Sequence, residues 1–530
     1  MDESATLRLF FNLTRFNCLI MSQKSQNHKI ILGLKVRQLR TEKRLSFAVL
    51  SEQTGMSVSY LNEIEKGKKY PKEDKIRLLA SALDTTSDSL ISADMPQSLS
   101  AVEDLLQSNF LNELPLDLFG IEMNKVVEII ANAPMRVAAF ISTLVELGRN
   151  YALREENFYF GALRSYLELN NNYFDELEEA VRQFIKQNKV PTGHSLPDHF
   201  LAGLLEKKYG YKIVNNGLDA YPELKNIRSV FVPKTKQLLL NSSLNEQQRA
   251  FQFGKELGFN ALSLKERAYT ASLQKVKTFD EALNHFKAGY FSAALLMYRE
   301  AFVKDMEKFL KMEKWDNGAL IMQLMQKYQA TPEMLFQRIT NVLPHFFGLK
   351  KLFFLRFVHR IDANEFDMSK ELHLNRRHNP HGNGLEEHYC RRWVSVSLLK
   401  ELELIQKSQS TTNSSSSSNN FKKEDIIVGI QRSHYFQTND EYLCFTIARP
   451  SGTRNVSVTI GILIDNESKQ IIKFINDPQI SHREVSTTCE RCEIMDCAER
   501  AFDPIVVQQK KQRAKINDTL KKILDNRPPQ

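Results

Sequence analysis

The chain has 530 residues, of which 42% are hydrophobic and 25% charged, and its formal net charge is +9. This composition is typical of folded globular proteins, and the length predicts several domains. The excess of Lys and Arg fits a nucleic-acid partner. The sequence has no apolar run of about 18 residues, which argues against a membrane-spanning helix. Six cysteines in so long a chain do not indicate a disulfide framework, and we therefore expect a cytoplasmic protein without membrane contact.

The first 28 residues are expected to be a disordered extension that precedes the folded domains. Residues 9–20 form a short, partly apolar stretch that Arg15 interrupts, and no small-residue cleavage site follows it. A signal peptide is therefore not indicated. Met21 opens a polar lead into the first domain and is the expected start of the functional chain.

A pattern of two short helices joined by a tight turn lies between residues 46 and 67. Ser46 and Ser57 are suitable N-cap residues, and Gly55 can adopt the left-handed conformation that ends a helix. This layout predicts a helix-turn-helix, whose second helix enters the major groove of DNA. A helical hairpin that binds protein is the alternative. Apolar residues occupy the positions where such a pair would meet a core: Val49, Leu50, Met56, Leu61 and Ile64.

The second helix of this pair leaves several side chains on its outer face. We expect Val58, Ser59 and Asn62 to read operator bases, and basic residues around them to neutralise phosphates. Flanking helices are predicted over residues 29–43, 72–83 and 87–91, which completes a five-helix domain at residues 29–91. The full set of expected DNA-binding residues is Ser46, Ser57, Val58, Ser59, Asn62, Glu63, Lys66, Lys68, Lys35 and Arg40.

These motifs resemble the Cro/CI (Xre) family of DNA-binding domains. Two positions depart from the family pattern. Phe47 stands where the family often has a glutamine that anchors the first helix to DNA, and Ser51 replaces the small apolar residue that packs the two helices. The resemblance rests on Leu45-Ser46, Gly55-Met-Ser57, Tyr60-Leu61, Ile64-Glu-Lys-Gly67, Pro71 and the run from Leu78 to Leu83.

The region at residues 101–190 is predicted to be helical throughout. Its apolar residues recur at helical spacing, which is most often the sign of a packed core. We expect this middle region to serve in dimerisation or as a lever between domains.

Residues 198–345 begin with a helix, continue with three short β-like runs and then form a helix at residues 244–262. This order resembles the core of the ImmA/IrrE metallopeptidase-like family, whose corresponding helix carries His-Glu-x-x-His. In that motif the two His bind zinc and the Glu is the general base. Aligned on Glu256, this chain has Lys255 and Phe259 where the two His would be. The resemblance therefore implies a degenerate domain that keeps the fold and has lost the peptidase chemistry.

Three cysteines lie close together near the end of the chain, at Cys489, Cys492 and Cys497. Thiolates so close together repel one another unless a cation holds them. Cys390 is the expected fourth ligand, with His388 as its rival, and four thiolates would suit zinc or an iron–sulfur cluster. A set of free buried thiols is the alternative.

The C-terminal region at residues 346–505 is expected to be a small α+β domain with a Ser-rich insertion at residues 407–423. Residues 506–530 form a basic tail, for which a solvated or capping helix is the preferred interpretation. The predicted fold class is thus multidomain and mainly α with α+β parts. A five-helix Cro/CI-type helix-turn-helix is followed by a helical middle, a metallopeptidase-like α+β domain and a C-terminal α+β domain that contains the cysteines.

This order of domains resembles the short-chain fatty acyl-coenzyme A regulators (ScfR). The resemblance covers residues 34–504 and is strongest at residues 55–67, 286–297 and 489–504. It implies a transcriptional regulator without catalytic residues that binds double-stranded DNA as a homodimer or homotetramer. It also implies an acyl-coenzyme A as the effector. Two alternatives remain: a DNA-tethered, ImmA-like metalloprotease or antirepressor, and a regulator that senses metal or redox state.

Overall fold

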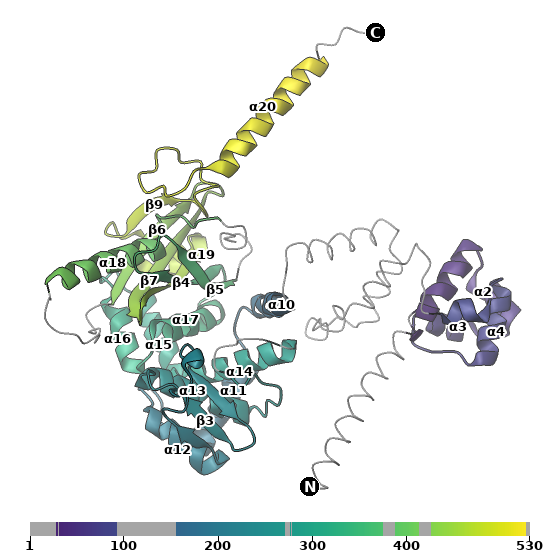
Figure 1. Ribbon diagram of the computed structural model, residues 1–530, viewed down its shortest axis with the longest axis horizontal. Helices are drawn as coiled ribbons and strands as arrows, with labels where there is room; N and C mark the ends of the chain where they lie inside the picture. Colours follow the sequence, from purple (N-terminus) through teal and green to yellow (C-terminus); the bar gives the residue numbers. More distant parts are fainter. Residues whose placement is uncertain are drawn as a thin grey trace. The chain divides into compact units, whose positions relative to one another are not determined.

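Figure 1 shows the computed structural model of the chain, which divides into two compact units, residues 1–162 and 163–530. The structure describes residues 28–29, 31–92, 155–270, 276, 278–374, 387–412 and 426–525. Parts of four expectations lie outside these residues: the extension before residue 28, the helical middle at residues 101–154, the Ser-rich stretch at residues 413–423 and the end of the basic tail at residues 526–530.

Residues 31–92 of the N-terminal unit form five helices, which confirms the predicted five-helix domain. Residues 31–42 are helical. They are followed by α2 (Phe47–Thr54), α3 (Val58–Glu65), α4 (Glu73–Ala82) and α5 (Ser87–Ile91). These helices share an apolar cluster whose buried members include Leu32, Leu50, Leu61, Leu79 and Leu90.

The second unit begins within α10 (Glu155–Leu169) and contains a small three-stranded sheet. The strands are β1 (Lys212–Val214), β2 (Ser229–Val232) and β3 (Gln237–Leu240), in the order β1-β3-β2. They coincide with the three β-like runs predicted from the sequence. The helices between α10 and the second sheet are α11 (Asp175–Asn188), α12 (Asp198–Tyr209), α13 (Glu246–Ala261), α14 (Phe279–Leu296), α15 (Arg299–Leu310), α16 (Ala319–Tyr328) and α17 (Pro332–Phe346).

Helices α13 and α14 approach each other closely because two glycines of α13 face α14. A methyl group on Gly254 would come within 2.4 Å of Oγ of Ser292, and one on Gly258 within 3.1 Å of the carbonyl oxygen of Ala288. A larger residue at Gly254 would therefore have to displace the Ser292 side chain or move the helices. The close packing fixes the side chains that α13 and α14 present to each other.

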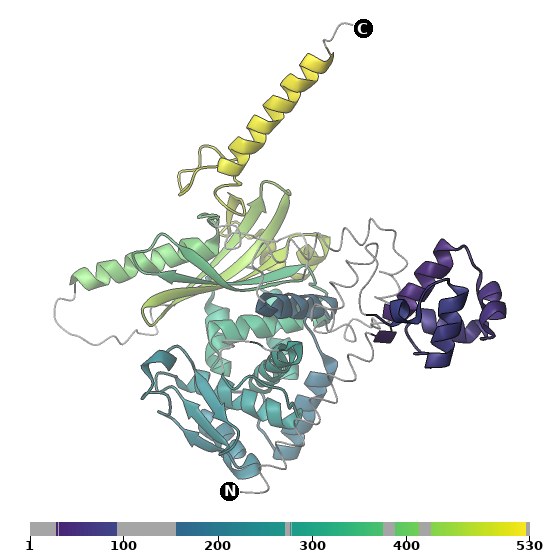
Figure 2. The same ribbon diagram turned by 45° about the vertical axis from the view of Figure 1, so that its right-hand side comes forward.

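A second sheet has six strands in the order β5-β4-β8-β7-β6-β9, antiparallel except between β6 and β9. Side chains alternate between its faces. Phe354 points toward α17, whereas Phe353 and Leu355 point toward α18, so each face has its own apolar cluster. Figure 2 shows α18 and α17 on opposite sides of this sheet. The strands and remaining helices are β4 (Leu352–Arg360), β5 (Phe366–His373), α18 (Val394–Thr412), β6 (Ile427–Tyr435), β7 (Asp440–Ser451), β8 (Arg454–Leu463), α19 (Asn466–Ile471), β9 (Ser481–Val485) and α20 (Ile505–Asp525).

The large sheet and the preceding helices share one core, although the sequence predicted separate domains at residues 198–345 and 346–505. One apolar cluster contains Phe291 of α14 and Leu335 of α17 together with Phe354 of β4 and Ile460 of β8. Phe184 of α11 belongs to it as well, so the end of the predicted middle region is part of the same body. Among the described helices, none combines the length and the apolar character needed to cross a bilayer.

A buried ion pair joins the start of this body to its centre. Arg338 of α17 is fully buried and donates through both terminal nitrogens to the carboxylate of Glu178 on α11, with 3.1 Å between Nη2 and Oε2. The hydroxyl of Tyr290 donates to the same carboxylate at 2.8 Å, and Nε of Arg338 donates to the carbonyl of Met297 at 3.1 Å. Burial alone would raise the pKa of Glu178, but the Arg338 charge outweighs it and holds that pKa below its ordinary value.

Replacing Arg338 by methionine should strongly destabilise this unit, because the Glu178 carboxylate would remain buried without a cation. Breaking a buried pair in this way typically costs about 3–5 kcal/mol. The measurement is the free energy of unfolding from urea denaturation. Arg182→Met is the matched control, because Arg182 also lies on α11 but is exposed, and its pair with Glu179 at the surface is screened by water and should matter little for stability. Equal losses of stability for the two variants would contradict the assignment.

Candidate functional site

The two helices of the helix-turn-helix begin and end as the sequence predicted. The Ser46 hydroxyl accepts a hydrogen bond from the backbone N of Val49, and the Ser57 hydroxyl accepts one from the N of Tyr60, both at 3.2 Å. Gly55 between them is left-handed, with φ 63°. Such a conformation favours glycine because a β-carbon would clash with the backbone. These caps fix the angle at which α3 leaves the turn.

The outer face of α3 is open at the positions expected to read bases. Val58 and Ser59 are exposed, and Asn62 and Glu63 are partly exposed. Buried Leu61 and Ile64 hold the opposite face against the core. An apolar side chain as exposed as Val58, at 45%, is suited to a contact with a base edge or a thymine methyl group.

Exposed Lys66 and Lys68 follow directly after α3 and extend its polar face. Lys69, which sequence reasoning left out, continues this basic run and pairs with Glu63 at 3.0 Å. A lysine run beside a groove-reading helix is well placed to contact phosphates.

Lys35 and Arg40 are not placed to contact phosphates, in contrast to the expectation from the sequence. The ammonium of buried Lys35 donates to the carbonyls of Ser89 and Ser92, at 2.7 and 2.8 Å, and so holds the end of α5. Arg40 forms a two-pronged ion pair with Glu65, at 2.6 and 3.0 Å, and its guanidinium lies 4.2 Å from the centre of the Phe47 ring. Phe47, the departure from the family pattern, therefore packs against a structural arginine.

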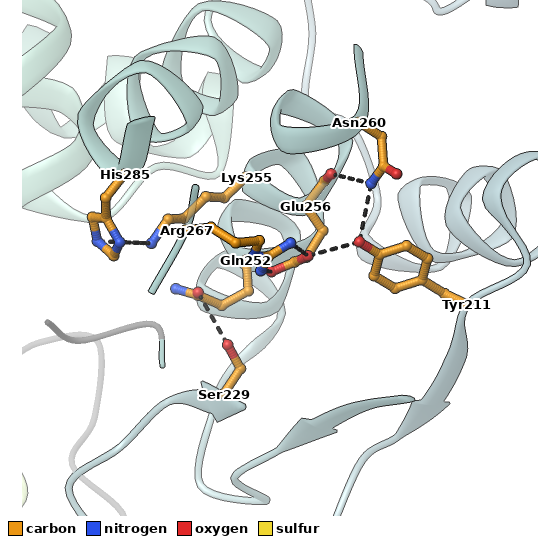
Figure 3. A network of polar contacts seen from close by, with 8 residues as sticks. All are labelled: Tyr211, Ser229, Gln252, Lys255, Glu256, Asn260, Arg267 and His285. Carbon is orange, nitrogen blue, oxygen red and sulfur yellow. Dashed lines mark hydrogen bonds and ion pairs between the residues drawn. The ribbon is translucent and has the colours of Figure 1, made fainter. Parts of the chain in front are cut away.

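The second candidate site surrounds Glu256 on α13 (Figure 3). Its carboxylate accepts hydrogen bonds from two neighbouring side chains, Arg267 and Tyr211. Arg267 donates from Nη1 and Nη2 to the two carboxylate oxygens, at 2.8 and 2.7 Å. The hydroxyl of Tyr211 donates to the same group at 2.9 Å, and Asn260 donates to that hydroxyl at 3.0 Å. The guanidinium of Arg267 also lies 3.9 Å from the centre of the Phe259 ring.

Lys255, the residue before Glu256, forms a buried pair with His285 of α14. Its Nζ lies 2.8 Å from Nε2 of the His285 ring. Burial lowers the pKa of Lys255 from 10.5 to about 7, although the Glu256 carboxylate acts in the opposite direction. Burial and the Lys255 charge together lower the pKa of His285 well below 6.5. His285 is therefore neutral at pH 7, and the Lys255 ammonium gives up its proton far below its ordinary range.

These side chains do not fit the zinc ion that a metallopeptidase would hold. The two positions of the zinc-binding His carry an amine and a phenyl ring, and His285 is engaged by Lys255. The oxygens of Glu256 accept hydrogen bonds from a guanidinium and a phenol, whereas a general base needs an oxygen within reach of the water that it activates. The side chains around Glu256 pair their charges with one another, and among them none is placed to polarise a water molecule.

The two cysteine-containing segments predicted to form one site do lie together. The backbone N of Cys390 donates to the carbonyl of Thr487 at 3.1 Å, and the N of Cys489 donates to the carbonyl of His388 at 2.8 Å. Cys390, Cys489 and Cys492 are buried. Burial raises the pKa of Cys390 to about 11, which favours its neutral thiol.

The described residues contain no group of three or more His, Cys, Asp or Glu side chains arranged to hold a metal ion, so the predicted metal stays a prediction. Cys497 is only partly buried, unlike the other three cysteines of the set. His388, the rival fourth ligand, has Nδ1 2.7 Å from the Glu490 carboxylate. Arg500 donates to the carbonyls of Cys489 and Cys492, at 3.0 and 3.1 Å, and fixes the turn that carries them.

Sequence reasoning missed four members of the Glu256 network. Tyr211, Asn260, Arg267 and His285 were not singled out, and three of them lie outside α13, the helix that carries Glu256. The useful signal was the missing motif itself, since a buried Glu without its metal requires another cation nearby.

Comparison with known families supports both the helix-turn-helix and the metallopeptidase-like region around Glu256. Residues 31–93 match the model of a helix-turn-helix domain, and residues 215–340 match the model of an IrrE N-terminal-like domain. The chain therefore joins a DNA-binding type of domain to a metallopeptidase-like one. This confirms the pairing expected from the sequence, an Xre-type helix-turn-helix with an ImmA/IrrE-like domain.

Two curated relatives share this chain's sequence over long stretches. The HTH-type transcriptional regulator PrpR of Mycobacterium tuberculosis is 24% identical over 303 residues, which are 54% of this chain and 60% of that protein. The HTH-type transcriptional regulator RamB of the same species is 26% identical over 253 residues, 44% of this chain and 49% of that protein. The matches thus span less than two thirds of each relative. A solved structure titled Mycobacterium tuberculosis transcriptional regulator aligns with a TM-score of 0.43 and 17% identity, over 65% of this chain and 93% of that one.

Replacing Lys255 by methionine should remove a pH dependence of stability. The folded-state pKa of Lys255 is depressed from 10.5 to about 7, so between these values the unfolded chain binds more protons than the folded one. The free energy of unfolding of the unsubstituted protein should therefore rise with pH in this window, by up to about 2–3 kcal/mol from pH 7 to pH 9.

The measurement is urea denaturation at pH 7, 8 and 9 and constant ionic strength. Lys255→Met should lose this rise, whereas Lys207→Met, a change at an exposed lysine of α12, should keep it. Parallel stability curves for the Lys255 variant and the unsubstituted protein would contradict a buried amine that titrates near neutral pH.

Proposed function

We propose that this protein is a sequence-specific DNA-binding transcriptional regulator and not an enzyme. The observation that carries the proposal is the capped helix pair α2–α3, which leaves the outer face of α3 open while the opposite face packs into the core. The family match of residues 31–93 supports it, as does the class of the two relatives, both HTH-type transcriptional regulators. A homodimer would match two half-sites about one helical turn apart.

Base reading would depend on Val58, Ser59 and Asn62 of α3. The amide of Asn62 can donate and accept at the same time, which suits paired contacts with an adenine edge. Lys66 and Lys68 would neutralise phosphates, so removing either charge would lower the salt dependence of binding.

Asn62→Ala should cost about 1–3 kcal/mol of affinity for the operator and leave binding to random duplex almost unchanged. Lys68→Gln should instead weaken binding to both duplexes and reduce the slope against salt by about one. Gel-shift titrations on the gene's own promoter region at several salt concentrations measure both effects. Arg77→Gln on α4 is the control, because this exposed charge lies outside the expected set of DNA contacts.

The proposal fails if the unsubstituted protein shows no preference for any promoter fragment over random competitor at physiological salt. It also fails if Asn62→Ala and Arg77→Gln bind the operator with equal affinity, because α3 would then not read bases.

An acyl-coenzyme A from short-chain acyl metabolism is the effector that we propose, on the strength of the resemblance to the ScfR regulators. The effector must bind one arrangement of the DNA-binding units more tightly than another, since equal binding would shift nothing. Acetyl- or propionyl-coenzyme A should therefore change operator affinity in the same gel-shift assay. Unchanged affinity with every acyl chain tried would remove the effector from the proposal and leave the DNA-binding part standing.

The non-enzymatic interpretation is supported by the Glu256 network rather than by any missing ligand. Lys255 and Phe259 are not zinc donors, and the Glu256 carboxylate is engaged in an ion pair with Arg267. The rival function, a DNA-tethered metalloprotease, predicts zinc-dependent proteolysis that Glu256→Gln abolishes.

We further propose that Cys390, Cys489, Cys492 and Cys497 hold zinc or an iron–sulfur cluster. The support is that Cys390 meets the later cysteines from a distant segment and that thiolates are preferred donors for both. Such a group would crosslink the two segments and could make DNA binding responsive to metal or redox state. Elemental analysis of anaerobically purified protein separates zinc, iron and neither. Cys492→Ser should lose the metal, and Cys444→Ser, a buried thiol outside the set, should retain it.

A further inference from the structure

Only the first turn of α20 packs on the rest of the described chain. The side chain of Val507 is buried there, and the backbone N of Val506 donates to the carbonyl of Glu490 at 3.2 Å. From residue 508 to residue 521 every residue is exposed, and residues 523 and 524 are exposed as well. Figure 1 shows this helix in yellow, as the last element before the C-terminus. Most of α20 is therefore exposed on all its sides.

The exposed part of α20 has an apolar stripe. Ile516, Leu520, Ile523 and Leu524 follow one another at the spacing i, i+4, i+7 and i+8, which places them on one side of a helix. Each of these four residues is more than half exposed, from 51% at Ile516 to 58% at Ile523. Most helical stability in proteins comes from packing such an amphipathic face. The stripe is therefore a surface that gains stability when another helix or protein surface covers it.

The body of the chain lies against the opposite side of α20. Val507 precedes Ile516 by nine residues, which is two and a half turns at about 3.6 residues per turn. The two side chains thus point in opposite directions from the helix axis, so the surface that buries Val507 cannot also cover the stripe. Arg513 lies on the same side as Ile516, three residues earlier, and ends the apolar stripe there. The stripe is thus confined to the end of the helix that is farther from the body.

The residues on both flanks of the stripe are neutral. Ile516 and Ile523 are seven residues apart, like two d positions of a heptad, and Leu520 takes the a position between them. Asn517 then stands at the e position and Thr519 at the g position. Charges at e and g decide which helices can pair, because like charges repel across the contact. With an amide and a hydroxyl at these positions, two copies of α20 can meet along the stripe without repulsion.

The lysines of α20 lie away from the stripe. At about 100° per residue, Lys511, Lys515 and Lys521 are closer to the side of Val507 than to the side of Ile516. Two copies that paired along their stripes would therefore turn these lysines outward, away from each other. A helix adapted to an acidic partner would instead have its positive charges beside the apolar residues, where they could pair with carboxylates. The charge pattern of α20 thus favours a second copy of the same helix.

The contact between two such stripes is small. Stable interfaces bury about 1,200–2,000 Å² in total, and four aliphatic residues from each helix cover less than this. Pairing through α20 is therefore expected to be weak and to depend on protein concentration. It would act together with any other link between the copies, such as a shared duplex.

We propose that α20 is a self-association helix, which pairs with α20 of a second copy of this chain along Ile516, Leu520, Ile523 and Leu524. The contact needs neither DNA nor a small molecule, so the inference goes beyond the proposed function and does not depend on it. For a regulator, the contact would let two copies bind neighbouring sites on one duplex with a higher effective concentration than free copies have.

The test compares two charge variants of the full chain, Leu520→Glu and Leu520→Lys, by sedimentation velocity without DNA over a range of concentrations. Leu520 lies in the middle of the stripe, so it meets the second copy near that copy's own Leu520. Each variant alone would place like charges in an apolar contact and should raise the apparent dissociation constant at least roughly tenfold. An equimolar mixture of the two variants should associate again, because a carboxylate then faces an ammonium group.

Ala514→Glu and Ala514→Lys are the matched controls. Ala514 is exposed and lies on the side of α20 opposite the stripe, so these changes introduce the same charges outside the contact. Both controls should associate like the unsubstituted protein. All four variants change exposed residues and should leave the midpoint of thermal unfolding almost unchanged, so a loss of association would not reflect a loss of folding.

Four results would overturn the proposal. The first is an unsubstituted protein that stays monomeric at every concentration tested. The second is equal self-association of Leu520→Glu and Ala514→Glu, which would place the contact elsewhere. The third is a mixture of the two Leu520 variants that associates no better than either alone. The last is binding to phosphatidylglycerol vesicles that Leu520→Glu loses and Ala514→Glu keeps, without self-association, which would make the stripe a membrane contact.

Discussion

The ion pair between Glu178 and Arg338 is the interaction on which the larger unit depends. It joins α11, which precedes the IrrE-like region, to α17, which packs on the large sheet, and Tyr290 ties α14 to the same carboxylate. Because α13 packs closely on α14, the position of α13, which carries Glu256, is set from the same point. Helices, small sheet and large sheet are therefore packed into one body.

The Glu256 network shows how a metallopeptidase-like core keeps its electrostatic balance with different residues. A carboxylate buried in this position needs a positive charge beside it. Arg267 supplies that charge through its ion pair with Glu256. The amine of Lys255, the preceding residue, instead forms a hydrogen bond with the neutral His285 ring. The charged side chains of this interior therefore hold one another in place without a metal ligand set.

Local features of this fold were predictable because they depend on neighbouring residues. The caps at Ser46 and Ser57, and the strands β1 to β3, follow from patterns within a few positions. The roles of Lys35 and Arg40 were not predictable in this way, since their partners Ser92 and Glu65 lie 57 and 25 residues away along the chain. A basic residue on a predicted surface helix can turn its charged end inward. The residues next to it in the sequence do not reveal this orientation. The shared core likewise depends on strands β4 and β8, which are far apart in the chain.

The contact between Arg267 and Phe259 also bears on how such a domain evolves. A protein that had lost only a ligand could regain it by one substitution. Here the replacement residues pack on each other, with the guanidinium 3.9 Å from the ring centre and bound to Glu256. Histidines restored at both positions would meet a resident cation that repels an incoming dication. The packing of the present residues therefore opposes a zinc site at these positions, and introducing one would demand several coordinated changes at once.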